Sequence, residues 1–242
     1  MARSKRAEKQ RRGNNEPQYN NRGIVQFKKA TIPNILPRNI AQEDYMYHMA
    51  DPSNNIIFAI GPAGTGKTLL CTMMGVKALK EKSIRKLIVT RPAVSVDEQH
   101  GFLPGDLNEK MAPWTRPIFD ILEKYFTTMD IEGMLEEKII EIAPLAYMRG
   151  RTFEDAWIIA DEMQLTTPNQ MKMLLTRIGN NTKLIVTGDL EQADRGKDNG
   201  LVDFLERMED RNSNRIAINR FSTMDIERHP VVEEIIGIYN EK

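Results

Sequence analysis

The segment Gly61-Pro62-Ala63-Gly64-Thr65-Gly66-Lys67-Thr68 decides how this chain is interpreted. It has two glycines five positions apart followed by Lys and Thr, which is the pattern of a phosphate-binding loop. The glycines let backbone N–H groups turn inward around phosphate oxygens, where side chains would block the approach. Lys67 would reach the β- and γ-phosphates, and the Thr68 hydroxyl would hold Mg²⁺. The segment therefore predicts a binding site for a nucleotide and Mg²⁺.

The residues on either side of the loop support this prediction. Ile56-Ile57-Phe58-Ala59-Ile60 precedes it, an apolar run typical of a strand buried on both faces. The segment after it has apolar residues at helical spacing, namely Leu69, Leu70, Met73, Met74 and Leu79. A helix that begins behind the loop adds partial positive charge at its N-terminus. The order strand, loop, helix argues against the alternative, a glycine-rich turn that binds nothing.

Composition limits the class of protein. The chain has 242 residues, of which 40% are hydrophobic and 28% are charged, as in a globular protein with a substantial core. No apolar run approaches the roughly 20 residues of a membrane span, and the N-terminus lacks the apolar stretch of a signal peptide. Cys71 is the single cysteine, which excludes a disulfide framework and a cysteine-based zinc site within one chain. We expect a cytoplasmic protein without membrane contact.

Charge divides the chain unevenly. Residues 1–30 hold nine Lys or Arg and two Glu, a balance of +7 that the remaining residues offset. We expect residues 1–23 to be a disordered basic tail, 24–40 an extended lead-in segment, and 41–242 one folded domain. The tail could contact nucleic acid or an acidic partner, or it could simply be solvated.

Apolar runs and helical periodicity predict an α/β domain with a mostly parallel sheet and helices on both faces. Residues 94–117 contain several glycines and prolines and are predicted to form a long loop. Besides residues 56–60, strands are expected at 86–90, 138–143, 156–160, 183–187 and 215–219. Besides the helix after the phosphate loop, helices are expected at 41–50, 117–130, 168–178, 201–208 and 230–239.

A second motif completes the predicted site. The apolar run Ala156-Trp157-Ile158-Ile159-Ala160 ends in Asp161 and Glu162. Asp161 would hold the Mg²⁺, commonly through a water, and Glu162 would polarise the attacking water. Together with Lys67 and Thr68, these acids predict Mg²⁺-dependent hydrolysis of ATP.

Two glutamines are further candidates. Gln42 precedes the loop by about 20 residues, and its amide could read an adenine edge because it both donates and accepts hydrogen bonds. The alternative is a surface glutamine, which the spacing alone favours. Gln192 follows the predicted strand 183–187, where an amide could sense the γ-phosphate or its water.

Several segments in this order resemble the PhoH family. They are Thr90-Arg91-Pro92, Gly101 to Leu107, Arg149-Gly150-Arg151-Thr152, Asp161-Glu162-Met163-Gln164, Leu175 to Gly179, Gly188 to Asp194, and Asp225 with Arg228-His229. Gln42 and Tyr45 fit the family's adenine-side segment. The resemblance covers about residues 37–240. It implies a RecA-like P-loop NTPase domain, similar to the first motor domain of superfamily 1 helicases. It also implies a hexameric ring that acts on RNA or single-stranded nucleic acid.

Two other functional classes stay open. A nucleotide-switched scaffold would hydrolyse ATP slowly and mainly recruit a partner. A nucleoside kinase could also combine a phosphate loop with an Asp-Glu-x-Gln motif. Kinases of that kind usually carry a four-cysteine zinc site, which the single Cys71 cannot supply.

Turnover is expected to need a neighbouring subunit. An arginine supplied in trans stabilises charge on the γ-phosphate in the transition state. The chain is too short after residue 220 for a second motor domain, so a head-to-tail ring is the expected source. The candidates are Arg149, Arg151, Arg177, Arg195 and Arg228, and any of them could instead brace an acid within its own subunit.

Overall fold

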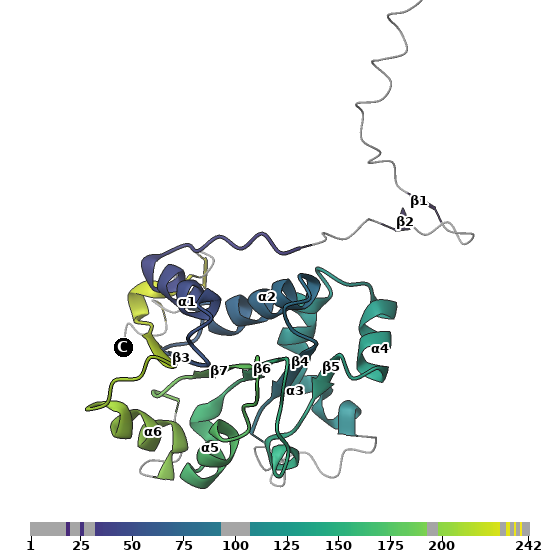
Figure 1. Ribbon diagram of the computed structural model, residues 1–242. Helices are drawn as coiled ribbons and strands as arrows, with labels where there is room; N and C mark the ends of the chain where they lie inside the picture. Colours follow the sequence, from purple (N-terminus) through teal and green to yellow (C-terminus); the bar gives the residue numbers. More distant parts are fainter. Residues whose placement is uncertain are drawn as a thin grey trace, which may run out of the picture. The chain divides into compact units, whose positions relative to one another are not determined.

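The structure is a computed structural model, which describes residues 18–19, 25–26, 32–92, 107–192, 198–227, 231–232, 235 and 238 (Figure 1). The chain divides into two units, Met1–Ala30 and Thr31–Lys242. In the first, β1 (Gln18–Tyr19) pairs antiparallel with β2 (Val25–Gln26). The rest of residues 1–23, predicted to be disordered, lies outside the described residues. The predicted boundaries at residues 23 and 40 stay predictions.

The second unit is built on a six-stranded parallel sheet with the strand order β5-β4-β6-β7-β3-β8. All six predicted strands are confirmed, three of them with the predicted bounds and three with bounds that differ by one or two residues. Because β7 lies between β3 and β6, the loop after β3 and the acids after β6 face each other across the end of β7. The strands are β3 (Ile56–Ile60), β4 (Lys86–Thr90), β5 (Ile140–Ile142), β6 (Ala156–Ala160), β7 (Lys183–Gly188) and β8 (Ile216–Arg220).

Helices cover both faces of this sheet, as predicted; in Figure 1, α1 and α2 lie above it and α5 and α6 below. Strand side chains alternate between two cores, so that Ile57 and Ile185 belong to one while Phe58 and Val186 belong to the other. The first core includes residues of α1 (Ile40–Ala50), α2 (Lys67–Lys80), α3 (Leu107–Leu122) and α4 (Thr128–Glu136), and the second includes residues of α5 (Pro168–Leu175) and α6 (Gly200–Met208).

A glycine in α2 determines how closely that helix approaches the sheet. A Cβ on Gly75 would lie 2.8 Å from both Leu87 Cδ1 of β4 and Trp157 Cδ1 of β6. The missing side chain therefore lets α2 pack directly against these strands. The indole N–H of Trp157 also donates to the Cys71 carbonyl at 3.1 Å. These contacts hold α2 against β4 and β6.

The helices between β4 and β5 differ from the sequence prediction. Residues 107–117, predicted to lie in a loop, are helical, and α3 includes both Pro113 and Pro117. Proline removes one helical hydrogen bond, but its fixed φ fits a helix, and the buried Ile118 and Leu122 hold α3 against the core. The predicted helix 117–130 is in fact two helices, because Thr127 starts α4 with a capping box. Residues 93–106 of the predicted loop lie outside the described residues.

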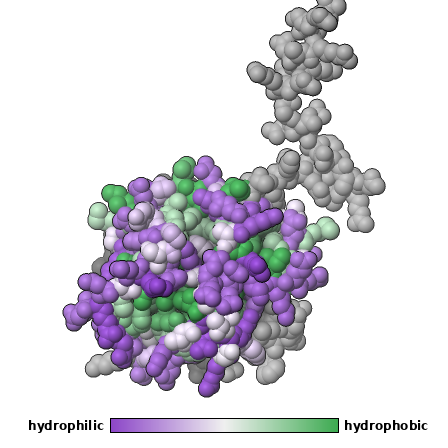
Figure 2. Space-filling view, in the orientation of Figure 1, coloured by the Kyte–Doolittle hydropathy of each residue, from purple (hydrophilic) through white to green (hydrophobic). Residues whose placement is uncertain are grey.

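Two later helices also differ from prediction. Helix α5 ends at Leu175 rather than residue 178, because Ile178 forms a parallel bridge with Phe153. Of the predicted closing helix 230–239, residues 231–232, 235 and 238 are described and are helical. Among the described residues, no helix is long and apolar enough to cross a membrane. The face of the molecule shown in Figure 2 is largely hydrophilic, with separate apolar patches.

Candidate functional site

The phosphate loop joins β3 to α2 in a conformation that depends on its glycines. Gly61, Gly64 and Gly66 have φ of 149°, 87° and 85°, a region that side chains disfavour. A Cβ on Gly61 would lie 2.3 Å from the Phe221 carbonyl oxygen, so the close approach of these segments requires glycine. The buried Thr65 hydroxyl donates to the Pro62 carbonyl at 3.0 Å and closes the turn. The loop therefore presents the first N–H groups of α2 toward an open cavity.

That cavity has a volume of about 270 Å³ and brings the predicted residues together. The phosphate loop forms one wall, and residues that follow β6 and β7 form the other. Its lining comprises Ala63, Gly64, Gly66, Lys67, Thr68, Leu69, Asp161, Glu162, Thr187, Gly188, Asp189 and Gln192. Among the predicted loop residues, Gly61, Pro62 and Thr65 shape the turn from behind rather than line the cavity.

Lys67 spans the loop from the start of α2. Its ammonium group donates to the carbonyl oxygens of Gly61 at 2.7 Å and Pro62 at 2.6 Å. Burial lowers the pKa of Lys67, while the charges of Asp189, Glu162 and Asp161 oppose that shift, Asp189 most strongly. The lysine thus lies within the field of three acids, where a bound phosphate would add further negative charge.

Asp161 is held by two hydroxyl groups from separate elements. The Thr68 hydroxyl donates to its Oδ1 at 2.9 Å, and the Thr187 hydroxyl of β7 donates to the same oxygen. This set fits Mg²⁺, because that ion is usually bound by one or two protein oxygens together with waters and substrate phosphates. Thr187 was not predicted from the sequence. A threonine near the end of an apolar strand gives no signal that distinguishes it from a core residue.

Glu162 has a left-handed backbone conformation, with φ 56° and ψ 40°, that is uncommon for a residue with a side chain. Its Oε1 forms an ion pair with Arg91 Nη2 at 3.3 Å. Its Oε2 accepts a hydrogen bond from Gln164 Nε2 at 2.6 Å. Arg91 and Gln164 belong to motifs recognised in the sequence, but the sequence did not indicate that both would hold Glu162.

Gln192 connects to this cluster only indirectly. Its amide donates to Asp189 Oδ2 at 2.8 Å, and the Asp189 backbone N–H donates to Gln164 Oε1 at 3.2 Å. The exposed Gln192 also lines the cavity. A chain of contacts therefore runs from Glu162 through Gln164 and Asp189 to Gln192.

Gln42 is buried, at 4% exposure, so the interpretation as a surface glutamine is wrong. Its Nε2 donates to the Thr65 carbonyl at 3.1 Å, and its Oε1 accepts from the Arg38 N–H at 3.0 Å. It therefore attaches α1 and the lead-in segment to the phosphate loop. A role in reading adenine stays a prediction.

A segment after β8 also packs against the loop. The Phe221 ring meets the buried Tyr45 edge to face, with centroids 5.7 Å apart. The Glu227 N–H donates to the Gly64 carbonyl at 3.0 Å. Between them, Ser222 and Asp225 form a capping box, a local motif that the sequence could have revealed.

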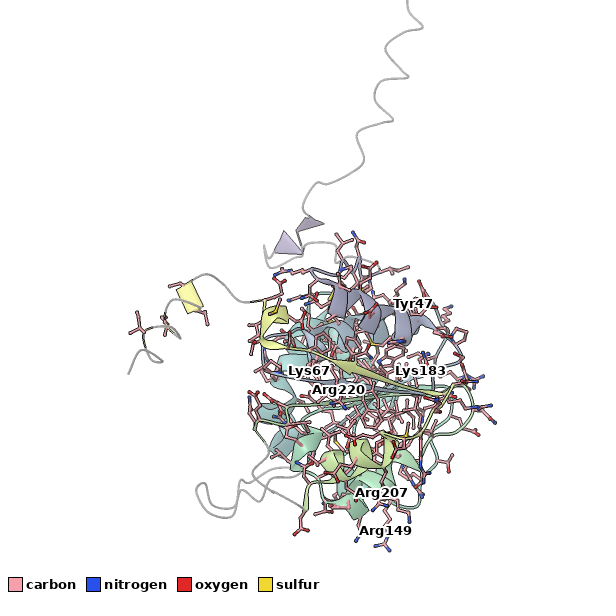
Figure 3. All side chains as sticks on the ribbon, turned by 90° about the vertical axis from the view of Figure 1, so that its left-hand side faces the viewer. Tyr47, Lys67, Arg149, Lys183, Arg207 and Arg220 are labelled. Carbon is pink, nitrogen blue, oxygen red and sulfur yellow. The ribbon has the colours of Figure 1, made fainter. Side chains whose placement is uncertain are left out.

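The candidate arginines lie in different settings. Arg151 forms an ion pair with Glu141, so it braces an acid within its own subunit. Arg177 donates to the carbonyl oxygens of Met173 at 3.1 Å and Arg151 at 3.2 Å. Arg149 is exposed, and Figure 3 shows it far from Lys67. Arg195 and Arg228 lie outside the described residues. A function of any of them in a neighbouring site stays a prediction.

Comparison with protein families gives a consistent result. The sequence model of a family described as PhoH-like protein matches residues 34–240. A PhoH-like protein of Bacillus subtilis (strain 168) is 45% identical over 217 residues, which cover 89% of this chain and 67% of that protein. Protein PhoH of Escherichia coli (strain K12) is 43% identical over 222 residues, 90% of this chain and 61% of that protein. A PhoH-like protein of Mycobacterium tuberculosis (strain ATCC 25618 / H37Rv) is 45% identical over 210 residues, and the chain covers 58% of its length.

Two solved structures are similar at low identity. The large terminase of bacteriophage HK97 has a TM-score of 0.48 at 13% identity, over 80% of this chain and 41% of that chain. The Pif1 helicase from Candida albicans has a TM-score of 0.39 at 14% identity, over 85% of this chain and 44% of that chain. Both TM-scores are below 0.5, so these two likenesses carry no functional inference.

Proposed function

Because this chain belongs to the PhoH family, we propose that it binds ATP with Mg²⁺ and hydrolyses it at the cavity between the phosphate loop and the ends of β6 and β7. The observation that carries the proposal is the 2.9 Å contact between the Thr68 hydroxyl and Asp161, with Glu162 as the next residue. This contact joins the two motifs that Mg²⁺–ATP chemistry needs, and they lie 93 residues apart in the sequence.

Each group has a distinct part in the proposed reaction. The N–H groups of the loop and the Lys67 ammonium bind the phosphates, and Lys67 leaves the carbonyls of Gly61 and Pro62 to do so. Thr68 and Asp161 hold Mg²⁺, which would neutralise charge on the β- and γ-phosphates when bound.

Glu162 is proposed to accept a proton from the attacking water and so to raise the nucleophilicity of its oxygen. Gln192 reaches the same cavity and is proposed to position the γ-phosphate or that water. Gln42 lies behind the loop and is proposed to contact adenine. Such a contact would make the site prefer ATP over CTP and UTP.

Action on RNA or single-stranded nucleic acid, as a hexameric ring, is the finer part of the proposal. It is supported by the +7 balance of residues 1–30, because clustered Lys and Arg neutralise phosphates. In such a ring, an arginine from one subunit would enter the site of its neighbour. The first candidates to test for this arginine are Arg149, which is exposed, and also Arg195 and Arg228.

The test is ATP turnover by the purified chain, with and without Mg²⁺, for the wild type and for Glu162→Gln. The variant should bind ATP as the wild type does and lose turnover, because only the base has changed. Glu206→Gln, at an exposed position on α6, is the matched control and should behave as the wild type. Equal turnover by Glu162→Gln and the wild type would refute the assignment. A wild type that binds ATP but does not hydrolyse it would favour the nucleotide-switched scaffold.

A further inference from the structure

Gln164 is a buried side chain that touches the proposed base from outside the cavity. It is 2% exposed and lies in the short helical turn Met163–Leu165 that follows β6. Its amide contacts Glu162 on one side and the end of β7 on the other. Because Gln164 does not line the cavity, any effect that it has on the reaction must pass through a neighbouring residue.

The two ends of the Gln164 amide face partners of opposite kinds. Its Oε1 accepts from the Asp189 backbone N–H at 3.2 Å, and its Nε2 donates to Glu162 Oε2 at 2.6 Å. A backbone N–H only donates and an ionised carboxylate only accepts, so one orientation of the amide satisfies both partners. Neither an ionised glutamate nor a methionine offers this combination of acceptor and donor. The position between the two partners therefore requires glutamine.

The end of this amide that faces β7 is closely packed. Asp189 is 6% exposed, and a Cβ on the preceding Gly188 would lie 3.1 Å from Gln164 Oε1 and 2.5 Å from Leu201 Cδ2. The backbone carbonyl of Gln164 also accepts from the fully buried Asn199 at 2.8 Å. The amide therefore has little room to rotate or shift.

Glu162 can still accept a proton while it is held in this way. Its side chain is 35% exposed, and it lines the cavity together with Lys67 and Thr68. An ionised carboxylate has about four lone-pair sites, so the contacts with Gln164 and Arg91 leave others available to a water. The contacts orient the proposed base without blocking it.

We propose that Gln164 is a positioning residue, which fixes the Glu162 carboxylate relative to the end of β7 in the orientation that hydrolysis needs. Gly188 and Asp189 at that end line the same cavity, so the base is aligned with the wall of the site that it serves. Alignment matters because proton transfer requires the base to lie within hydrogen-bond reach of the water. This inference rests on the proposed ATPase function and concerns the positioning of its base.

The test compares steady-state ATP turnover of the wild type with Gln164→Met and Gln164→Glu. Gln164→Met retains the length of the side chain and removes the donor. Its kcat should fall about tenfold to a hundredfold, the range for a lost hydrogen bond to a charged group. KM for ATP should change less than about twofold, because Gln164 does not line the cavity. Gln164→Glu retains the shape but repels Glu162 when ionised, so its kcat should also fall at least about tenfold.

A double variant shows whether the effect passes through Glu162. In a Glu162→Gln background, Gln164→Met should lower the residual turnover less than about twofold, because the base that Gln164 positions is already absent. A loss as large as in the wild-type background would refute a role that acts through Glu162.

Asn219→Leu is the matched control for the loss of a buried amide. Asn219 is 6% exposed, donates to the Phe58 carbonyl at 3.3 Å, contacts His48 Nδ1 at 2.8 Å and does not line the cavity. This variant should lower the thermal unfolding midpoint and leave kcat unchanged.

The inference is refuted if Gln164→Met folds and loses no more activity than Asn219→Leu. If Gln164→Met does not fold, the more conservative Gln164→Glu decides, because a wild-type kcat in that variant also refutes the inference. Absence of turnover in the wild type would refute the proposed ATPase function itself.

Discussion

Replacing Thr187 by Val removes one hydroxyl group from the end of β7 and retains the shape of the side chain. The Thr187 hydroxyl donates to Asp161, and the two residues are 1% and 8% exposed. Water therefore has little access to replace the lost hydrogen bond. Of the two hydroxyl groups that donate to Asp161, only that of Thr68 remains after the substitution.

The size of the effect follows from these contacts. A hydrogen bond to a charged group contributes about 1.5–3 kcal/mol net, and the lower end applies because Asp161 keeps one donor. We expect the free energy of unfolding to fall by about 1.5 kcal/mol. In the proposed site the same hydroxyl would orient Asp161 toward Mg²⁺, so turnover at subsaturating Mg²⁺ should fall by roughly tenfold if that energy is lost from ion binding.

Two measurements check this expectation, namely urea unfolding and ATP turnover across a Mg²⁺ titration. Thr72→Val is the control, because the buried Thr72 hydroxyl donates to the Thr68 carbonyl within α2 rather than to Asp161, and Thr72 itself does not line the cavity. It should cost less than about 0.5 kcal/mol. In an Asp161→Asn background, Thr187→Val should lower the free energy of unfolding by less than it does in the wild type. If Thr187→Val matches Thr72→Val in both measurements, Thr187 does not position Asp161.

Three further predictions concern the surroundings of the site. Gln42→Ala should narrow the preference for ATP over CTP and UTP by a few-fold, about 1 kcal/mol. Unchanged competition binding by the three nucleotides would leave Gln42 with its structural contacts to Thr65 and Arg38 and no role in reading adenine. The hydrogen bond from Arg151 lowers the pKa of Glu141 in the folded protein. The pair therefore stabilises the fold at a pH above about 4.3, the pKa of a glutamate in the unfolded chain. This stabilisation is lost as the pH falls through the lower pKa that Glu141 has in the folded protein. Glu141→Gln should therefore lower the free energy of unfolding by at most about 1 kcal/mol at pH 7, because the partial exposure of Arg151 weakens the ion pair. In acid, urea unfolding of the variant and the wild type should give the same free energy. Burial raises the pKa of the Cys71 thiol to about 12, so a thiol reagent at pH 8 should label it only after unfolding; rapid labelling of the folded protein would show that α2 opens.

Local sequence patterns were sufficient to identify segments whose proposed roles depend on residues adjacent in the chain. The phosphate loop and Asp161-Glu162 each follow directly from an apolar strand, and their chemistry depends on residues adjacent in the chain. The strands β3, β4, β6 and β7 were predicted because a buried parallel strand is a short, mostly apolar run. Prediction failed at α3, where Pro113 and Pro117 indicated a loop. Burial of Ile118 and Leu122 favours a helix there, and the sequence does not show that burial.

The sequence by itself therefore located the phosphate loop and the acidic pair, which the structure brings together at one cavity. Only the tertiary structure decided which other side chains complete it. Thr187 meets Asp161 across 26 residues, and Gln42 meets Thr65 across 23. The Arg91–Glu162 ion pair depends on β4 lying beside β6, and nothing in either strand specifies its neighbour in the sheet. The physical reason is that strand order is set by how helices on both faces pack and by the long-range register of the ladders, which local composition does not encode.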